Sequence, residues 1–205
     1  PRIVELARRY GAKVMVDDAH ATGVIGEHGG GTTDHFHLKG AVDMVMGTLS
    51  KSIGATGGFV VSNKETINYL RHYSRSYIFS TGLTPPVIAS AVEAINIIED
   101  EPELRQVLWN NTHYMHDNLK ALGYDVFPSP PESPVMIILI RDEVKLRQMS
   151  RRIHERGIFL NAVPYPAVPR DECRFRISLM ATHTKQDMDE TLDVLGDVGK
   201  EFGII

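Results

Sequence analysis

Gly47-Thr48-Leu49-Ser50-Lys51-Ser52-Ile53-Gly54 places a lysine among small and hydroxyl-bearing residues, directly after the apolar run at 42–47. A lysine that forms a Schiff base needs a partly desolvated site, and small neighbours allow a flat ring to lie close. Thr48 and Ser50 are hydroxyl donors suited to a phosphate. A surface lysine in a Gly-rich turn is the simpler interpretation, and this segment alone favours it.

A second segment, residues 14–20 (VMVDDAH), ends a predicted strand with two acids and a histidine. Open α/β sheets bind their ligands at the C-terminal ends of strands, where Asp17 is expected. A carboxylate beside the nitrogen of a pyridoxal-phosphate (PLP) ring keeps that nitrogen protonated, and His20 is within reach of the ring's phenolic oxygen. The alternative is that Asp17 or Asp18 caps the following turn, the usual role of an isolated acid at a strand end.

Two other kinds of site use similar residues. Residues 17–20 (DDAH) resemble the Asp-Glu-Ala-His box of helicases, but no G-x-x-x-x-G-K-[ST] phosphate loop occurs in the chain. The histidines at 20, 28, 35 and 37 stand in a Gly-rich stretch, without the helical spacing or the cysteine partner typical of zinc sites. We therefore expect neither a helicase nor a metal site.

Composition narrows the functional classes further. The 205 residues are 42% hydrophobic and 23% charged with a net charge of -4, which is typical of an ordinary globular protein and gives no case for nucleic-acid binding. Cys173 is the only cysteine, so no intramolecular disulfide forms and a reducing, cytoplasmic setting is favoured. The longest apolar run, 135–140, is too short for a transmembrane helix.

The first half of the chain has an α/β rhythm. Helix and strand patterns alternate, and the strands are apolar throughout, which is typical of strands covered on both faces. We expect helices at 2–10, 64–73 and 85–98, strands at 13–17, 42–47 and 58–62, and mainly loop at 21–40.

The acidic stretch at 99–102 ends with a proline and is the candidate junction to a second, α+β domain. We expect two or three strands and three helices in that domain. One helix is predicted to end at Gly123, a second to cover about 143–156, and a third to carry an apolar stripe at 188–202. The strands are predicted at 135–140, 158–160 and 174–179.

The order of these segments resembles a known family. Residues 17–20, then 47–58 (GTLSKSIGATGG), 75–81 (RSYIFST), 164–169, 174–178 (RFRIS) and 180–184 (MATHT) are similar to the α-oxoamine synthases, a branch of the fold-type-I PLP enzymes. The resemblance covers the whole chain. It implies a PLP-dependent condensation of glycine or serine with an acyl-CoA, with loss of CO₂ and CoA.

The resemblance also assigns roles around the cofactor. Lys51 corresponds to the Schiff-base lysine and general base, Asp17 to the partner of the pyridine nitrogen, with Asp18 supporting it. His20 corresponds to the contact with the phenolic oxygen, and Thr48 and Ser50 to phosphate or ring contacts.

Three further residues extend the site. Ser80 and Thr81 correspond to residues that reach a partner's phosphate across a dimer interface, which implies a homodimer with shared active sites. Arg176 corresponds to the arginine that holds the substrate carboxylate, a role suited to a bidentate guanidinium. Without the resemblance, Arg176 reads as an ordinary residue on the solvent face of a strand.

The family places a Gly-rich phosphate segment and a ring-stacking side chain upstream of the DDAH motif, whereas only sixteen residues precede Asp17. We therefore expect the C-terminal half of a longer protein, inactive by itself. Residues 1–100 would be the end of the large, mainly parallel-sheet PLP domain, and 101–205 the small α+β domain. The alternatives are another fold-type-I enzyme such as an aminotransferase, and a fragment or partner subunit without catalysis.

Overall fold

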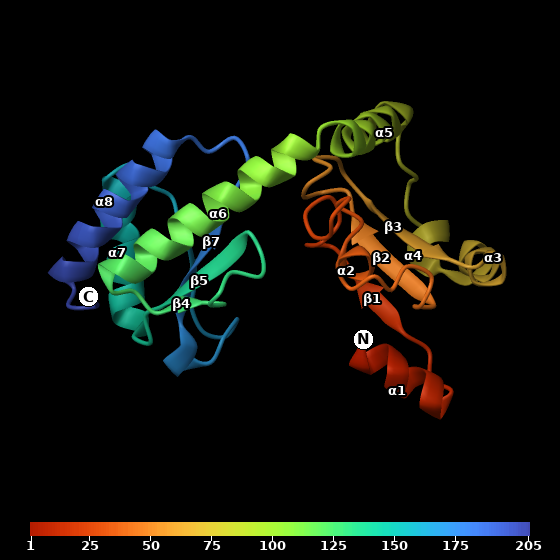
Figure 1. Cartoon of the computed structure of the whole chain (residues 1–205), viewed down its shortest axis with the longest axis horizontal. Helices are drawn as coiled ribbons and strands as arrows, with labels where there is room; N and C mark the ends of the chain where they lie inside the picture. The colour runs from red at the N-terminus through yellow and green to blue at the C-terminus, as the bar shows by residue number, and fades with distance from the viewer. The chain divides into compact units, whose positions relative to one another are not determined.

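Strand β2 (Met44–Thr48) is the centre of a three-stranded sheet in the first half of the chain. Strand β1 (Met15–Asp17) pairs with β2 in parallel, and β3 (Gly58–Ser62) pairs with it on the other side in antiparallel orientation. The computed structural model describes all 205 residues and divides into two units, Pro1–Arg105 and Gln106–Ile205. Figure 1 shows the three strands side by side in the first unit.

Five helices belong to the first unit, and a sixth begins there. They are α1 (Arg2–Tyr10), α2 (Thr32–His35), α3 (Lys64–Tyr73), α4 (Arg75–Ile78), α5 (Pro85–Asp100) and α6 (Pro102–Leu122). The predicted ends of α1 and α3 are confirmed. Gly11 caps α1 in the left-handed conformation, and the Asn63 side chain accepts from Thr66 N at the start of α3.

The prediction that these strands are covered on both faces is wrong for the chain as described. Met15 in β1 is 58% exposed and Val61 in β3 is 57% exposed. The buried cluster of this unit holds only Leu49, Ile53 and Ala91, because α5 is the one helix that supplies a buried residue to it. The short helices α2 and α4 were not predicted.

The second unit contains an antiparallel sheet in the order β4-β5-β7-β6. Its strands are β4 (Val126–Phe127), β5 (Val135–Leu139), β6 (Asn161–Val163) and β7 (Arg174–Ser178). The helices are most of α6, α7 (Glu143–Glu155) and α8 (Lys185–Glu201), with a 3-10 turn at Arg170–Glu172. Figure 1 shows α6, α7 and α8 beside this sheet, and all three contribute to one core.

The alternation predicted for 174–179 is confirmed by β7. Phe175 and Ile177 are buried, whereas Arg174 and Arg176 are half-buried, as expected for a strand whose side chains alternate between two faces. Residue 176 lies opposite Ile137 in β5 and Asn161 in β6.

The strand predicted at 158–160 is wrong, because the strand β6 comes three residues later. Gly157 N donates to His154 O and Ile158 N donates to Ile153 O, so this segment still closes the end of α7. Four strands form rather than two or three, since the two-residue β4 also pairs with β5.

None of the helices combines the length and apolar composition needed to cross a membrane.

Candidate active site

Two loops meet at the C-terminal ends of the parallel strands β1 and β2. Asp17 closes β1 opposite Met46, and Asp18 N donates to Met46 O at 2.8 Å. Farther along, Ser52 Oγ donates to Thr22 O at 2.6 Å, which ties the loop after β1 to the loop that carries Lys51. The ends of adjacent parallel strands are where open α/β sheets bind ligands.

The two neighbouring acids have different environments. Asp18 is 1% exposed, and its carboxylate accepts from Thr32 N at 3.1 Å and from Thr32 Oγ1. Its carbonyl also accepts from Ala21 N and Thr22 N, both at 2.9 Å. Asp18 therefore holds the loop in place, which is the capping role left open by the sequence.

Gly31 makes room for the buried Asp18 carboxylate. Its φ is +84°, and a Cβ at this position would lie 2.3 Å from Asp18 Oδ2. Only glycine fits both the conformation and the space.

The Asp17 side chain, in contrast, is exposed and accepts only from Ala19 N, at 2.9 Å. A carboxylate has room for about four hydrogen bonds, so Asp17 retains acceptor capacity for a ligand. His20 is likewise exposed, three residues farther along the same loop.

The Lys51 loop is closed by backbone hydrogen bonds. Leu49 N donates to Gly57 O at 2.9 Å, and Ala55 N donates to Leu49 O at 2.7 Å. Leu49 and Ile53 are buried on either side of Lys51 and anchor the loop. The Lys51 amine makes no hydrogen bond or ion pair, and its side chain is exposed rather than partly desolvated.

Thr48 and Ser50 form a hydroxyl pair beside the lysine, with their oxygens 2.8 Å apart. Thr48 Oγ1 accepts from Ser50 N and donates to Gly57 O. The structure thus places Thr48, the last residue of β2, beside the loop that carries Ser50 and Lys51. It joins that loop to the one that begins after Asp17 and carries His20.

Ser80 and Thr81 lie apart from this pair of loops in the chain, directly after α4. Both are exposed, and Ser80 Oγ donates to Ser76 O within the same segment. No hydrogen bond joins them to Lys51 or Asp17.

Arg176 belongs to the second unit, whereas Lys51 belongs to the first. It lines a pocket of about 530 Å³, and its Nε is buried without a hydrogen-bond partner. An unpaired buried donor costs roughly 1–3 kcal/mol, which a carboxylate acceptor would recover. The pocket is lined by Met115, Ile158, Phe159, Leu160, Asn161, Arg176, Ile177, Ser178, Leu179, His183, Asp187, Met188 and Thr191.

Several pocket residues were not predicted. Asn161 gave no signal in the sequence, because it meets Arg176 only through the register of β6 on β7. Asp187 was missed as well. The hydroxyl and the backbone N–H of Thr184 lower the pKa of its carboxyl, as expected at the start of a helix. The Thr-x-x-Asp spacing at 184–187 is a local signal that could have found it.

Known proteins are similar to this chain over its whole length. The family model described as aminotransferase class I and II matches residues 2–195. The 8-amino-7-oxononanoate synthase of Thermoanaerobacter pseudethanolicus is 44% identical over 205 residues, which are 100% of this chain and 51% of that protein. The serine palmitoyltransferase of Sphingobacterium spiritivorum is 44% identical over 204 residues and is covered to the same 51%.

Solved structures of serine palmitoyltransferases have the same fold as this chain. The serine palmitoyltransferase of Sphingomonas wittichii superposes with a TM-score of 0.94 at 32% identity, over 99% of this chain and 51% of that one. A structure described as SPT with PLP gives a TM-score of 0.95 at 33% identity, with the same coverage. The chain spans about half the length of the curated relatives it matches.

Proposed function

The chain belongs to the family of class I and II aminotransferases, and we propose that it is part of a PLP-dependent acyltransferase. The reaction would join glycine or serine to an acyl-CoA and release CO₂ and CoA. The resemblance to α-oxoamine synthases is confirmed, because the matched relatives carry the names of two members of that group. The observation that carries the proposal is the joining of the Asp17 and Lys51 loops at the ends of two parallel strands.

The residues present on these loops fit PLP. The cofactor needs an amine for attachment, a carboxylate for its ring nitrogen and donors for its phosphate, and Lys51, Asp17 and the pair Thr48–Ser50 supply these groups. Neither the Lys51 amine nor most of the Asp17 carboxylate is committed to another partner. His20 would contact the ring's phenolic oxygen. When bound, PLP supplies an electron sink for a carbanion at the amino acid Cα.

Each residue then has a definite task. Lys51 would remove the proton from Cα as general base, which requires that water be kept from its amine. Asp17 would hold the proton on the ring nitrogen. Arg176 would hold the substrate carboxylate with the guanidinium whose Nε lacks a partner here. We propose accordingly that 1–100 belongs to the PLP domain and 101–205 to the small domain.

We further propose a cytoplasmic homodimer with shared sites. The support is that Ser80 and Thr81 are exposed and make no hydrogen bond to the Lys51 loop. Their hydroxyls would reach the phosphate bound by a second copy. Amino acid and acyl-CoA would be the small-molecule partners.

Reductive trapping tests the central assignment. The chain is incubated with PLP and borohydride, and peptide mass spectrometry then locates the modified lysine. We expect selective labelling of Lys51 and loss of that label in Lys51→Ala. Lys39 and Lys64, which are also exposed, serve as internal controls. Equal labelling of all three lysines would contradict the proposal.

A second assay separates the reaction types. Because this chain is expected to be inactive by itself, free CoA is measured with the PLP-loaded full-length protein, which is offered glycine or L-serine with acyl-CoA substrates of different lengths. Release of CoA that depends on both substrates supports the acyltransferase. Transfer of the amino group to a keto acid without CoA release would instead identify an aminotransferase.

A further inference from the structure

We infer that Asn111 is a positioning residue for the Arg176 pocket. It fixes the turn at 180–183, which connects β7 to α8 and contributes to the pocket wall. The inference rests on the proposed role of Arg176 in holding a carboxylate, and it adds a residue of α6 to that site.

Asn111 is 9% exposed, and its amide nitrogen donates two hydrogen bonds. Nδ2 donates to Met180 O at 3.1 Å and to His183 O at 3.0 Å, so one side chain binds both ends of the turn. These partners are 69 and 72 residues away in the sequence.

The turn is also closed from within. His183 N donates to Met180 O at 3.3 Å, and Met180 N donates to His183 Nδ1 at 3.2 Å. The first of these hydrogen bonds is the i to i+3 contact of a β-turn, and at 3.3 Å it is long. Asn111 therefore supplies the two shorter contacts that hold the turn to the rest of the unit.

The position of the turn links Asn111 to the pocket. Ser178 and Leu179 line the pocket just before the turn, His183 lines it from the end of the turn, and Asp187 lines it from the start of α8. Arg176 precedes Ser178 on the same strand by two residues. A displacement of the turn would therefore move both walls of the pocket relative to the Arg176 guanidinium.

Loss of the Asn111 amide should loosen the turn without unfolding the unit. Met180 O keeps the hydrogen bond from His183 N, so the His183 carbonyl is the one that depends on the Asn111 donor. Helix α6 remains anchored by Met115 and Leu119, which are buried in the main core. The expected consequence is a change in ligand affinity larger than any change in the fold.

The chain offers a matched control in Asn118. It is the same residue type on the same helix, and its Nδ2 donates to Tyr114 O at 2.8 Å, inside α6 itself. Asn118→Ala removes an equivalent amide hydrogen bond that does not reach the turn.

The test uses the full chain and glycine as the probe, with methylamine as a control that lacks the carboxylate. NMR follows the Arg176 Nε–H signal, identified by its absence in Arg176→Lys, and the exchange of the His183 amide.

Asn111→Leu keeps the buried volume, and Asn111→Ala is the second variant in case leucine does not fit. We expect Asn111→Leu to raise the Kd for glycine at least about threefold and to speed His183 exchange about tenfold, while Asn118→Ala changes neither.

The outcomes separate two proposals: that Arg176 binds the carboxylate, and that Asn111 positions the turn beside it. If glycine does not shift the Arg176 signal in the unaltered chain, the proposed role of Arg176 fails, and His183 exchange still decides whether Asn111 fixes the turn. If glycine binds and both Asn111 variants keep its Kd, the positioning role is overturned, even where the melting temperature falls. A raised Kd with an unchanged melting temperature supports it most directly.

Discussion

The two units are nearly equal in length but bury very different amounts of apolar side chain. The second unit has a cluster of nineteen buried residues, whereas the first has three. The first unit also leaves large apolar side chains such as Phe79 and Val92 exposed. The half that carries Lys51 is therefore the half with the weaker core of its own.

This difference shows how a candidate catalytic lysine is held without much packing. In the first unit, hydrogen bonds around Asp18, Ser52 and Gly57 fix the loops. In the second unit, the pocket around Arg176 is built on a sheet whose other face is packed by three helices. Four predictions test this contrast, from the largest expected effect to the smallest.

The first prediction compares the two cores. Phe175→Ala should cost the second unit about 3–5 kcal/mol, because Phe175 is fully buried and its removal leaves a cavity. Ile53→Ala, in the first unit, should leave the stability of the second unit unchanged. Trp109 is the only tryptophan and lies in the second unit, so its fluorescence in a urea titration reports that unit alone.

The exposed Val144 on α7 gives the control, since Val144→Ala should cost less than about 0.5 kcal/mol. Equal losses for Phe175→Ala and Ile53→Ala at the Trp109 signal would mean that the two units unfold together. The difference in core size would then not give the two units separate free energies of unfolding.

The second prediction tests the hydrogen-bonded loop with a pair of glycines. Gly31 and Gly40 both have positive φ, of +84° and +77°, but only at Gly31 would a Cβ meet a neighbour, the Asp18 carboxylate. Gly40→Ala should cost about 1–2 kcal/mol of backbone strain. Gly31→Ala should cost more, because its ψ of -159° lies in a region essentially restricted to glycine, at about 1–3 kcal/mol, and the clash adds about 1–3 kcal/mol. Amide exchange at Thr32, which donates to Asp18, measures the difference.

If Gly31→Ala exchanges no faster than Gly40→Ala, the buried carboxylate is not what holds this loop. Borohydride trapping of PLP in the same two variants would add a functional readout. We expect selectivity for Lys51 to fall in Gly31→Ala and to persist in Gly40→Ala.

The sequence predicts which side chains are buried better in the second unit than in the first, for a physical reason. The apolar stripes of α6 and α8 and the alternation of β7 are complete patterns, because each element packs on partners within the same 100 residues. The strand β1 has the composition of a buried strand, but the layers that would cover Met15 are not packed on it here. Its apolar sequence describes an environment that this chain alone does not form.

The candidate site shows the same limit at the level of single residues. Lys51, Asp17 and His20 are predicted from short motifs, because each lies at the end of a strand or within a few residues of it. Asn161 and Asn111 could not be identified in this way, since they contact β7 or its turn across 15 to 72 residues. Such contacts depend on how distant strands and helices pair and pack, which no local sequence pattern encodes.

The third prediction uses pH to probe the second unit alone. Burial raises the pKa of Tyr124 to about 12, and its hydroxyl donates to Leu195 O at 2.7 Å. The folded state therefore keeps a proton that the unfolded state loses near pH 10. The stabilisation is fully present below pH 10 and is lost as the pH rises toward 12, by up to about 2 kcal/mol.

Urea titrations between pH 9 and 12, followed at Trp109, measure this loss. Tyr124→Phe should cost about 1 kcal/mol at neutral pH from the lost hydrogen bond and should flatten the profile above pH 10. A profile in Tyr124→Phe as steep as that of the unaltered chain would assign the pH dependence to another group.

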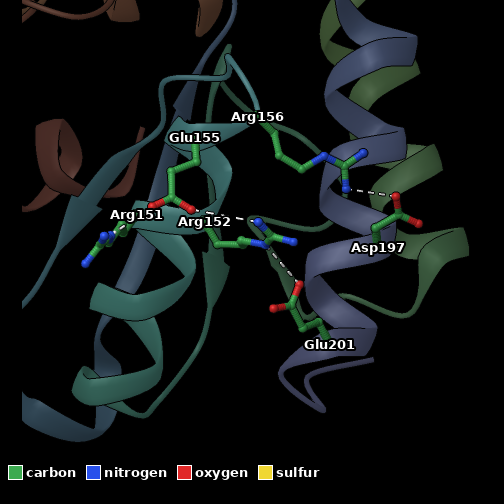
Figure 2. A network of polar contacts seen from close by, with 6 residues as sticks. All are labelled: Arg151, Arg152, Glu155, Arg156, Asp197 and Glu201. Carbon is green, nitrogen blue, oxygen red and sulfur yellow. Dashed lines mark hydrogen bonds and ion pairs between the residues drawn. The ribbon is translucent and has the colours of Figure 1, made fainter.

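The fourth prediction concerns the ion pairs between α7 and α8, shown in Figure 2. Arg152 Nε lies 3.2 Å from Glu201 Oε2, and Arg156 Nη1 lies 2.9 Å from Asp197 Oδ2. Their side chains are substantially exposed, so water and salt screen the attraction. A double-mutant cycle of Arg152→Ala and Glu201→Ala should give a coupling energy below about 1 kcal/mol that shrinks further at high salt. Because α7 and α8 already share the apolar core through Met149 and Leu195, a larger coupling would mean that charge as well as burial stabilises this unit.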